Sequence, residues 1–177
     1  LHRSNRGLVY VDPERKEVQF PVREPGSDGT ASDGMLLRHI DGGRYEIREP
    51  GQPTMQFEFR RDEVVAPLKS LQLGKAMMVF RYESNGRLVE VDACGKRIRV
   101  EHDAMGHVTG LILQENEHKQ VVSAYVYDVS GCLIQWTDAL GHSERYEYDQ
   151  QRRLTCHTTR LNFSFWHEYD ELGRCVR

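Results

Sequence analysis

Hydrophobic and polar residues alternate along most of this chain. The stretch at 96–102 is typical, because Ile98, Val100 and His102 fall on one face and three charged residues fall on the other. Alternation with a period of two is expected for half-buried β-strands. No long stretch has a helical period, and turn signals recur about every ten residues, which leaves strands of about five to seven residues. We therefore predict an almost wholly antiparallel β structure.

A four-residue turn motif separates these strands. It begins with aspartate, whose side chain accepts hydrogen bonds from the following backbone. It ends with glycine, which takes the left-handed conformation that closes a hairpin with a bulge. The predicted structural turns are Asp92–Gly95, Asp103–Gly106, Asp128–Gly131, Asp138–Gly141 and Asp170–Gly173, with variants at Glu83–Gly86 and at Asp149, where Arg152 replaces glycine. Degenerate copies are expected at 115–118 and 159–162.

A longer period lies on top of the short one. Tyr127, Tyr148 and Tyr169 each precede a turn aspartate and are 21 residues apart. The unit is therefore two hairpin arms, and Tyr82 occupies the same place before Glu83. Two further repeat aromatics, Tyr125 and Tyr146, lie two residues earlier on the same strand face. We expect the tyrosine rings to stack on neighbouring strands.

Composition narrows the functional classes. The 177 residues are 38% hydrophobic and 29% charged, with a net charge of −3, so we expect one domain or two small ones and no nucleic-acid partner. No apolar run approaches the roughly 20 residues of a membrane span. The chain starts without Met and without a signal peptide, so we interpret it as a piece of a longer polypeptide. Reduced thiols are the favoured state of Cys94, Cys132, Cys156 and Cys175, and two disulfides stay open as an alternative.

Catalytic motifs are missing from the sequence. It has no paired-histidine metal motif, no serine nucleophile elbow and no phosphate-binding loop, so we expect no enzyme activity, no metal and no cofactor. We expect His102, Asp103 and His142, which lie at turns, to bond the backbone. Trp136 and Trp166 are candidate binding residues for a sugar or a partner protein, although packing between strands is the favoured interpretation.

The turn-and-tyrosine pattern resembles the YD-repeat, or Rhs, family. The matching segments are FRYESNGRLVEVD at 80–92, YVYDVSGCLIQWTDALG at 125–141, RYEYD at 145–149 and EYDELGR at 168–174. Residues 65–177 are interpreted as about ten turn-and-strand units. Residues 1–64 resemble the β segment that leads into such repeats, through LVYVD at 8–12, VQFPV at 18–22 and GGRYEI at 42–47, with a loop at 24–34.

The resemblance implies a structural role. Rhs proteins are large bacterial toxins, often exported by type VI secretion, whose repeats wind a β-sheet into a hollow cocoon around a C-terminal toxin. Tc-toxin subunits and animal teneurins use similar shells. The chain would then be an open curved segment of a shell, made in the bacterial cytoplasm and secreted or delivered to target cells. Its partners would be the rest of the shell, the toxin domain and secretion-apparatus proteins.

Two further expectations come from the residues themselves. An aromatic-lined module that binds carbohydrate or protein at a cell surface stays open as the alternative function. The terminal strands of a segment cut from a continuous sheet would be unpaired edges, which predicts self-association of the isolated piece.

Overall fold

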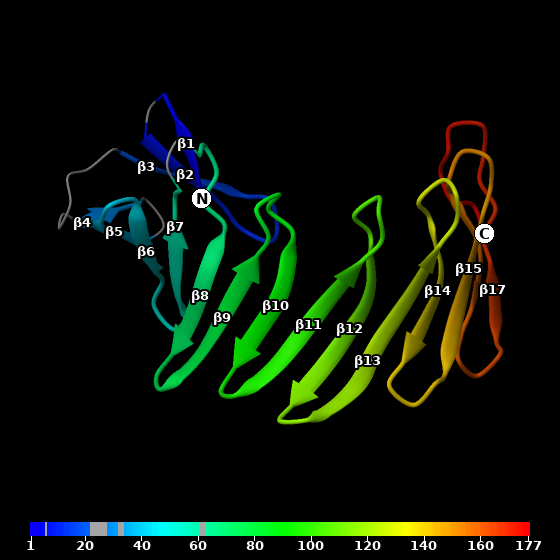
Figure 1. Cartoon of the computed structure of the whole chain (residues 1–177). Helices are drawn as coiled ribbons and strands as arrows, with labels where there is room; N and C mark the ends of the chain where they lie inside the picture. Colours follow the sequence, from blue (N-terminus) through cyan, green and yellow to red (C-terminus); the bar gives the residue numbers. More distant parts are fainter. Residues whose placement is uncertain (6, 22–27, 32–33, 61–62) are drawn as a thin grey trace. The chain divides into compact units, whose positions relative to one another are not determined.

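The computed structural model describes residues 1–5, 7–21, 28–31, 34–60 and 63–177. Strand and bridge residues make up 59% of these, and none of the described residues is helical, which confirms the all-β antiparallel prediction. No helix long and apolar enough to cross a membrane is found in these ranges. The chain forms two compact units, Leu1–Gly95 and Lys96–Arg177 (Figure 1). The expected border between residues 64 and 65 concerns where the repeats begin and stays a prediction.

The first unit contains two antiparallel sheets. The smaller has the order β1 (His2–Ser4), β2 (Gly7–Val11) and β3 (Glu17–Phe20). The larger follows chain order through β4 (Asp28–Thr30), β5 (Leu36–Asp41), β6 (Arg44–Arg48), β7 (Thr54–Glu58), β8 (Leu68–Leu73), β9 (Ala76–Tyr82) and β10 (Leu88–Ala93). Strand β4 lies inside the segment expected to be a loop, because it pairs with β5. Residues 24–27 and 32–33 of that segment lie outside the described residues.

The hydrophobic core of the first unit lies between its two sheets. Phe20 of β3 and Ile47 of β6 are almost fully buried, at 1% and 0% exposure. Leu8 and Phe57 belong to the same cluster and come from the smaller and the larger sheet. Burial of each such side chain stabilises the fold by about 1.5–3 kcal/mol. The hairpin β2–β3 therefore covers one face of the larger sheet.

The second unit is a single antiparallel sheet with little core. Its strands follow chain order through β11 (Lys96–His102), β12 (Val108–Glu115), β13 (His118–Tyr127), β14 (Leu133–Asp138), β15 (Ser143–Tyr148), β16 (Leu154–Thr158) and β17 (Ser164–Trp166). Of this unit, all of which the structure describes, Gly110, Ser123 and Cys156 are the buried residues. With so little apolar burial, the unit depends on hydrogen bonds and contacts that run from each strand to the next.

A β-bulge recurs beside the turns of one edge. Val126 pairs with Gln135 and Tyr127 pairs with Leu133, so Ile134 is skipped. The same shift skips Thr155. It also skips Val89 and Thr109, at the corresponding places of earlier hairpins. Each skipped residue lies six positions after the acidic residue that opens the turn. Because a bulge strengthens twist and interrupts the ladder, every such hairpin is deformed at the same place.

The last strand has an apolar, exposed edge. β17 pairs with β16 on one side only. Phe163, Phe165 and Trp166 are 64%, 56% and 62% exposed. A short hairpin follows, in which a bridge joins Tyr169 to Cys175.

Candidate functional site in the repeat turns

The turn at Asp128 shows the geometry that the repeats share. The Gly131 amide donates to the Asp128 carbonyl oxygen at 3.0 Å, and the Asp128 amide donates to the Cys132 carbonyl oxygen at 2.9 Å. The side-chain oxygen Oδ1 of Asp128 accepts from the amides of Ser130 and Cys132 at 2.8 and 2.9 Å. One carboxylate oxygen therefore holds two turn amides, as an aspartate at the first turn position is expected to do.

The same hydrogen bonds close the other turns. Oδ1 of Asp138, Asp149 and Asp170 each accepts two turn amides at 2.8–3.0 Å. The six predicted glycines all have left-handed φ, from 76° at Gly173 to 95° at Gly106. Arg152, which replaces glycine, keeps this conformation with φ of 60°. The degenerate copy at 159–162 is also a turn of this kind, with Asn162 in the glycine position at φ of 62°.

Two predicted turns differ from this geometry. At Glu83 the longer side chain does not bond the turn amides; Asn85 Oδ1 accepts from the Arg87 amide at 2.9 Å, and the Asn85 amide group donates to Glu83 at 3.1 Å. Asp92 lies inside β10, and the loop is Cys94–Gly95, with φ of 52° and 84°. Two left-handed residues in a row make a two-residue hairpin, which needs no aspartate.

A second side chain usually caps the turn carboxylate. The residue four positions after the aspartate donates to its Oδ2, at 2.9 Å from His107, 3.1 Å from His142 and 2.7 Å from both Arg153 and Arg174. The side-chain bond from His107 is the largest influence that lowers the pKa of Asp103. Backbone and side-chain bonds from the capping arginines lower the pKa of Asp149 and Asp170. Desolvation acts to raise the pKa of Asp138, but bonds from His142 bring it below its ordinary value.

Tyrosine hydroxyl groups connect alternate turns. Tyr127 donates to the carbonyl oxygen of Val108 at 3.0 Å, Tyr148 to that of Leu133 at 2.9 Å and Tyr169 to that of Leu154 at 2.9 Å. Each acceptor lies five positions after the aspartate of the previous turn on that edge, next to the bulge. Desolvation by burial raises the pKa of Tyr127 and Tyr148. We call this hydroxyl-to-carbonyl contact the tyrosine lock. In the first unit, Tyr82 donates to the Leu68 carbonyl oxygen at 2.9 Å.

The tyrosine rings contact the caps rather than one another. His107 stacks on Tyr127 with ring centroids 4.7 Å apart, and the Arg153 guanidinium lies 4.7 Å from the centre of the Tyr169 ring. Among the ring contacts of the described residues, none joins two repeat tyrosines, so the expected tyrosine-on-tyrosine stacking is not what the structure has. The reason is that a capping side chain lies beside the next tyrosine on that edge and occupies its face.

The two candidate tryptophans lie on opposite faces. Trp136 pairs directly with Tyr125 and Glu144, and its Nε1 donates to Ser123 Oγ at 2.7 Å. Trp166 pairs with Cys156, next to His157 in β16. Because adjacent strand residues point to opposite faces, Trp166 lies on the face away from Trp136 and His157. On that second face, His157 Nε2 and the Tyr146 hydroxyl both contact Glu144 Oε2, at 3.0 and 3.1 Å.

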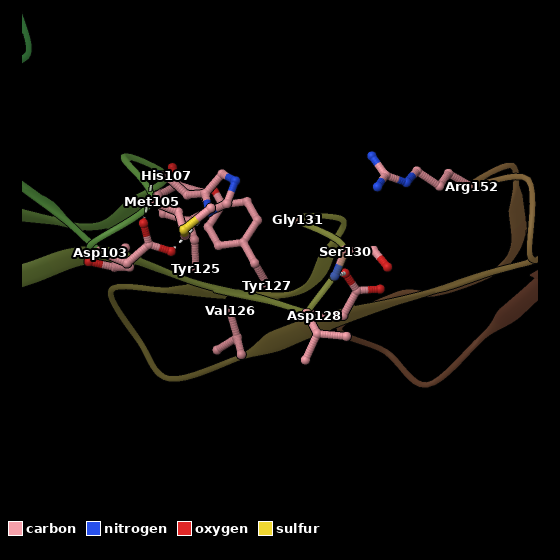
Figure 2. A pocket seen from close by; sticks show the side chains of 12 residues that line it. Asp103, Met105, His107, Tyr125, Val126, Tyr127, Asp128, Ser130, Gly131 and Arg152 are labelled. Atoms are coloured by element: carbon pink, nitrogen blue, oxygen red, sulfur yellow. Dashed lines mark hydrogen bonds and ion pairs between the residues drawn. The ribbon is translucent and has the colours of Figure 1, made fainter.

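An open groove of about 550 Å³ runs beside the Asp103 and Asp128 turns (Figure 2). Its lining includes Met105, His107, Tyr127 and Asp128, while Arg152 extends toward it from the next turn. No group of three His, Cys, Asp or Glu side chains suited to a metal ion occurs in the described parts of the chain. The cysteines of the second unit, Cys132, Cys156 and Cys175, are free thiols, as is Cys94.

The caps and the lock acceptors were not identified from the sequence. A signal for the caps was present, because His107, His142, Arg153 and Arg174 all stand four residues after an aspartate. The lock acceptor is a backbone carbonyl 15 to 19 residues away from its tyrosine, which no residue type marks.

Comparisons with known proteins agree with this geometry. A model of the teneurin YD-shell family matches residues 46–177. The double-stranded DNA deaminase toxin A of Burkholderia cenocepacia (strain H111) is 26% identical over 172 residues, which cover 93% of this chain and 12% of that protein. The chain thus spans about one eighth of this relative's length.

Solved toxin structures share the fold. The Tc holotoxin pore of Photorhabdus luminescens has a TM-score of 0.52 at 12% identity, covering 96% of this chain and 11% of that one. The TcdB2-TccC3-Cdc42 complex has a TM-score of 0.52 at 10% identity, with the same coverage. Identities this low show a common fold alone. The family model, however, matches about three quarters of the sequence, including every turn described above, and the chain belongs to the teneurin YD-shell family.

Proposed function

We propose that this chain is a structural segment of a toxin shell that encloses a C-terminal toxin for delivery to other cells. The observation that carries the proposal is the tyrosine lock. The distinctive side chains of the repeats, namely the turn aspartates, their caps and the tyrosines, bond other parts of the same sheet. Groups engaged in this way hold a sheet together and are not free to act on a substrate, so we propose no catalytic role for this segment.

The length of its relatives supports a larger assembly. A chain that spans 12% of a deaminase toxin supports the proposal that the repeats continue in a longer polypeptide carrying the rest of the shell and a toxin. We propose that repeats begin near residue 65, that the polypeptide is made in bacterial cytoplasm, and that type VI secretion exports it. We also propose that the isolated piece associates with itself through its edge strands.

A binding module for carbohydrate or protein is the second candidate function. The observation that favours it is the exposure of Phe165 and Trp166 on β17. Against it, the Trp136 N–H is bonded to Ser123, and the hydroxyls of the three lock tyrosines are bonded to the main chain. Saturable binding of a defined glycan that is lost in Trp166→Ala would favour this alternative.

The shell proposal is tested on the longer polypeptide. Limited proteolysis should leave its C-terminal toxin intact while the shell is closed. The triple variant Tyr127→Phe, Tyr148→Phe, Tyr169→Phe should expose the toxin to the protease at lower temperature or denaturant concentration, because each change removes one lock bond. Tyr125→Phe is the control, since no hydrogen bond of its hydroxyl is found in the described structure. A toxin that is digested equally fast with the native shell would contradict the proposal.

A further inference from the structure

The turn at Asp128 lacks the cap that the comparable turns have. At Asp103, Asp138, Asp149 and Asp170 the carboxylate Oδ2 is bonded by a histidine or arginine four positions later. At Asp128 that position is Cys132, whose short thiol is a weak donor. Within the described residues no side chain donates to Asp128 Oδ2. This turn therefore presents a carboxylate oxygen with an unused lone pair.

The aromatic half of the same place is also vacant. His107 and Arg153 cap one turn and at the same time lie 4.7 Å from the ring of the next tyrosine on that edge. After Asp128 the next such tyrosine is Tyr148. No ring or cation is found against Tyr148 in the part of the chain that the structure describes. Asp128 is one of the groups that raise the pKa of Tyr148, after desolvation and Cys132, so its negative charge is felt at this ring.

The vacancy opens onto solvent. Asp128 and Ser130 line the groove of about 550 Å³ (Figure 2). Two apolar side chains of the groove, Met105 and Val129, are 81% and 108% exposed. A ligand can thus reach Asp128 directly, and a ligand with apolar parts on either side of its charge could cover Met105 and Val129.

We propose that the Asp128 turn binds a guanidinium group. One N–H of the group donates to Asp128 Oδ2, as Arg153 Nε does at Asp149 at 2.7 Å. The planar group lies over Tyr148, as Arg153 lies over Tyr169. Guanidinium suits this place better than ammonium because it is planar, donates in a fixed geometry and stacks on aromatic faces. The guanidinium is carried either by an arginine of another protein segment or by a free guanidino compound.

Arg152 opposes this binding and limits its strength. It lines the groove, is exposed and has no ion-pair partner among the described residues (Figure 2). A like charge in solvent is largely screened, so we expect weak but measurable binding of a single arginine side chain.

The test uses this chain with N-acetyl-arginine amide as the probe. In a ¹H–¹⁵N correlation spectrum, the amides of Ser130 and Cys132, which bond Asp128 Oδ1, should shift and saturate. The uncharged isostere N-acetyl-citrulline amide should bind about tenfold more weakly or not at all, because the charge-assisted bond is lost. Equal shifts with both probes, or shifts confined to other turns, would overturn the proposal.

Matched variants locate the site. Cys132→Arg supplies the missing cap within the chain, so it should abolish probe binding and raise the melting temperature. Cys132→Ser, of similar size, should leave binding unchanged. Asp128→Asn keeps the oxygen for the turn amides but removes the charge, and should lose binding. Arg152→Ala should bind at least as tightly as the native chain. Binding that survives in Cys132→Arg, or a lower melting temperature in that variant, would show that the place is not a vacant cap site.

A last comparison separates the two sources. The peptide acetyl-Leu-Arg-Leu-amide should bind more tightly than the single residue if a protein segment is the ligand, and Met105→Ser with Val129→Ser should remove that gain. Equal affinities point to a free guanidino compound. Since the isolated chain is used, a negative result would leave the shell proposal untouched.

Discussion

The hydroxyl group of each lock tyrosine acts far from the turn that its neighbour opens. Tyr148 forms a hydrogen bond with the Leu133 carbonyl oxygen beside a bulge, where the regular ladder is interrupted. A phenylalanine would keep the ring and leave this half-buried carbonyl without its donor.

We expect Tyr148→Phe to lower the free energy of unfolding by about 1 kcal/mol, the usual net value of one such bond. Urea denaturation followed by circular dichroism measures the loss. The matched control is Tyr125→Phe, which should change stability by less than about 0.5 kcal/mol, the range of a surface change without a named partner. Equal losses in both variants would mean that the lock does not stabilise the sheet.

Glycine is needed more at one turn than at another. Gly131 and Gly141 have nearly the same φ, 80° and 85°. A Cβ on Gly131 would lie 3.0 Å from His107 Nε2, whereas a Cβ on Gly141 would have no atom within 4 Å. His107 cannot move freely, because it is bonded to Asp103 and stacked on Tyr127.

Gly141→Ala should therefore cost about 1 kcal/mol of stability from left-handed strain alone. Gly131→Ala should cost more, by about a further 1 kcal/mol, because the added methyl group displaces the His107 ring. Thermal unfolding of both variants gives the comparison. A smaller loss at Gly131 than at Gly141 would contradict the role given to His107.

Single residues explain why the turns could be predicted and the locks could not. The Asp128 bonds reach only two and four residues along the chain, so residue type and spacing are sufficient. The Glu83 and Asp92 turns show the limit of that reasoning, because one extra methylene group and a two-residue loop each remove the aspartate's role. The Tyr127 lock spans 19 residues and depends on where the bulge lies, which only the folded sheet defines.

At the scale of the hairpin, the turn carboxylates make stability depend on pH. The pKa values of Asp103, Asp149 and Asp170 lie below their ordinary value of 3.8. The folded state therefore binds these protons more weakly than the unfolded chain does. The resulting stability is fully present above pH 3.8 and is lost as the pH falls through the lower folded values.

Melting temperatures measured from about pH 7 down to about pH 2.5 should fall most steeply in the acid part of that range. Asp170→Asn should be less stable at neutral pH and should show a shallower decline, because one titrating group is gone. Glu171→Gln, a change of the exposed neighbouring residue in the same turn, should keep the native slope. A variant at Asp170 with the native slope would exclude these carboxylates as the cause.

The strands were predicted better than their packing. Alternation in 96–102 agrees with the observed exposure, since Ile98, Val100 and His102 are half-buried while Arg97, Arg99 and Glu101 are exposed. The sequence did not indicate that β2 and β3 would cover the first unit and bury Phe20 and Ile47, because alternation marks an apolar face without saying what lies on it. Strand β4 was also missed, since Asp28-Gly29-Thr30 has turn-forming residues and is held by pairing with β5.

For the whole molecule, β17 predicts association between copies. Its backbone is paired on one side only, and Phe165 and Trp166 are more than half exposed. An open edge with apolar side chains is a template for strand pairing. We expect light scattering to show dimers or larger species at increasing concentration, and Phe165→Lys with Trp166→Lys to shift them toward monomer. A strictly monomeric native chain at high concentration would contradict this expectation.

The lock also sets a rule for how such a gene can change in length. Each tyrosine bonds to a turn on the same edge of the sheet, two strands back, so the natural unit of gain or loss is a pair of strands. Deleting or duplicating 63 nucleotides, which encode 21 residues, leaves every tyrosine facing an equivalent carbonyl. Removing one strand would bring the next tyrosine to the opposite edge. The longer spacing between Asp103 and Asp128 shows what is tolerated: β12 and β13 are extended, and Tyr127 still bonds Val108.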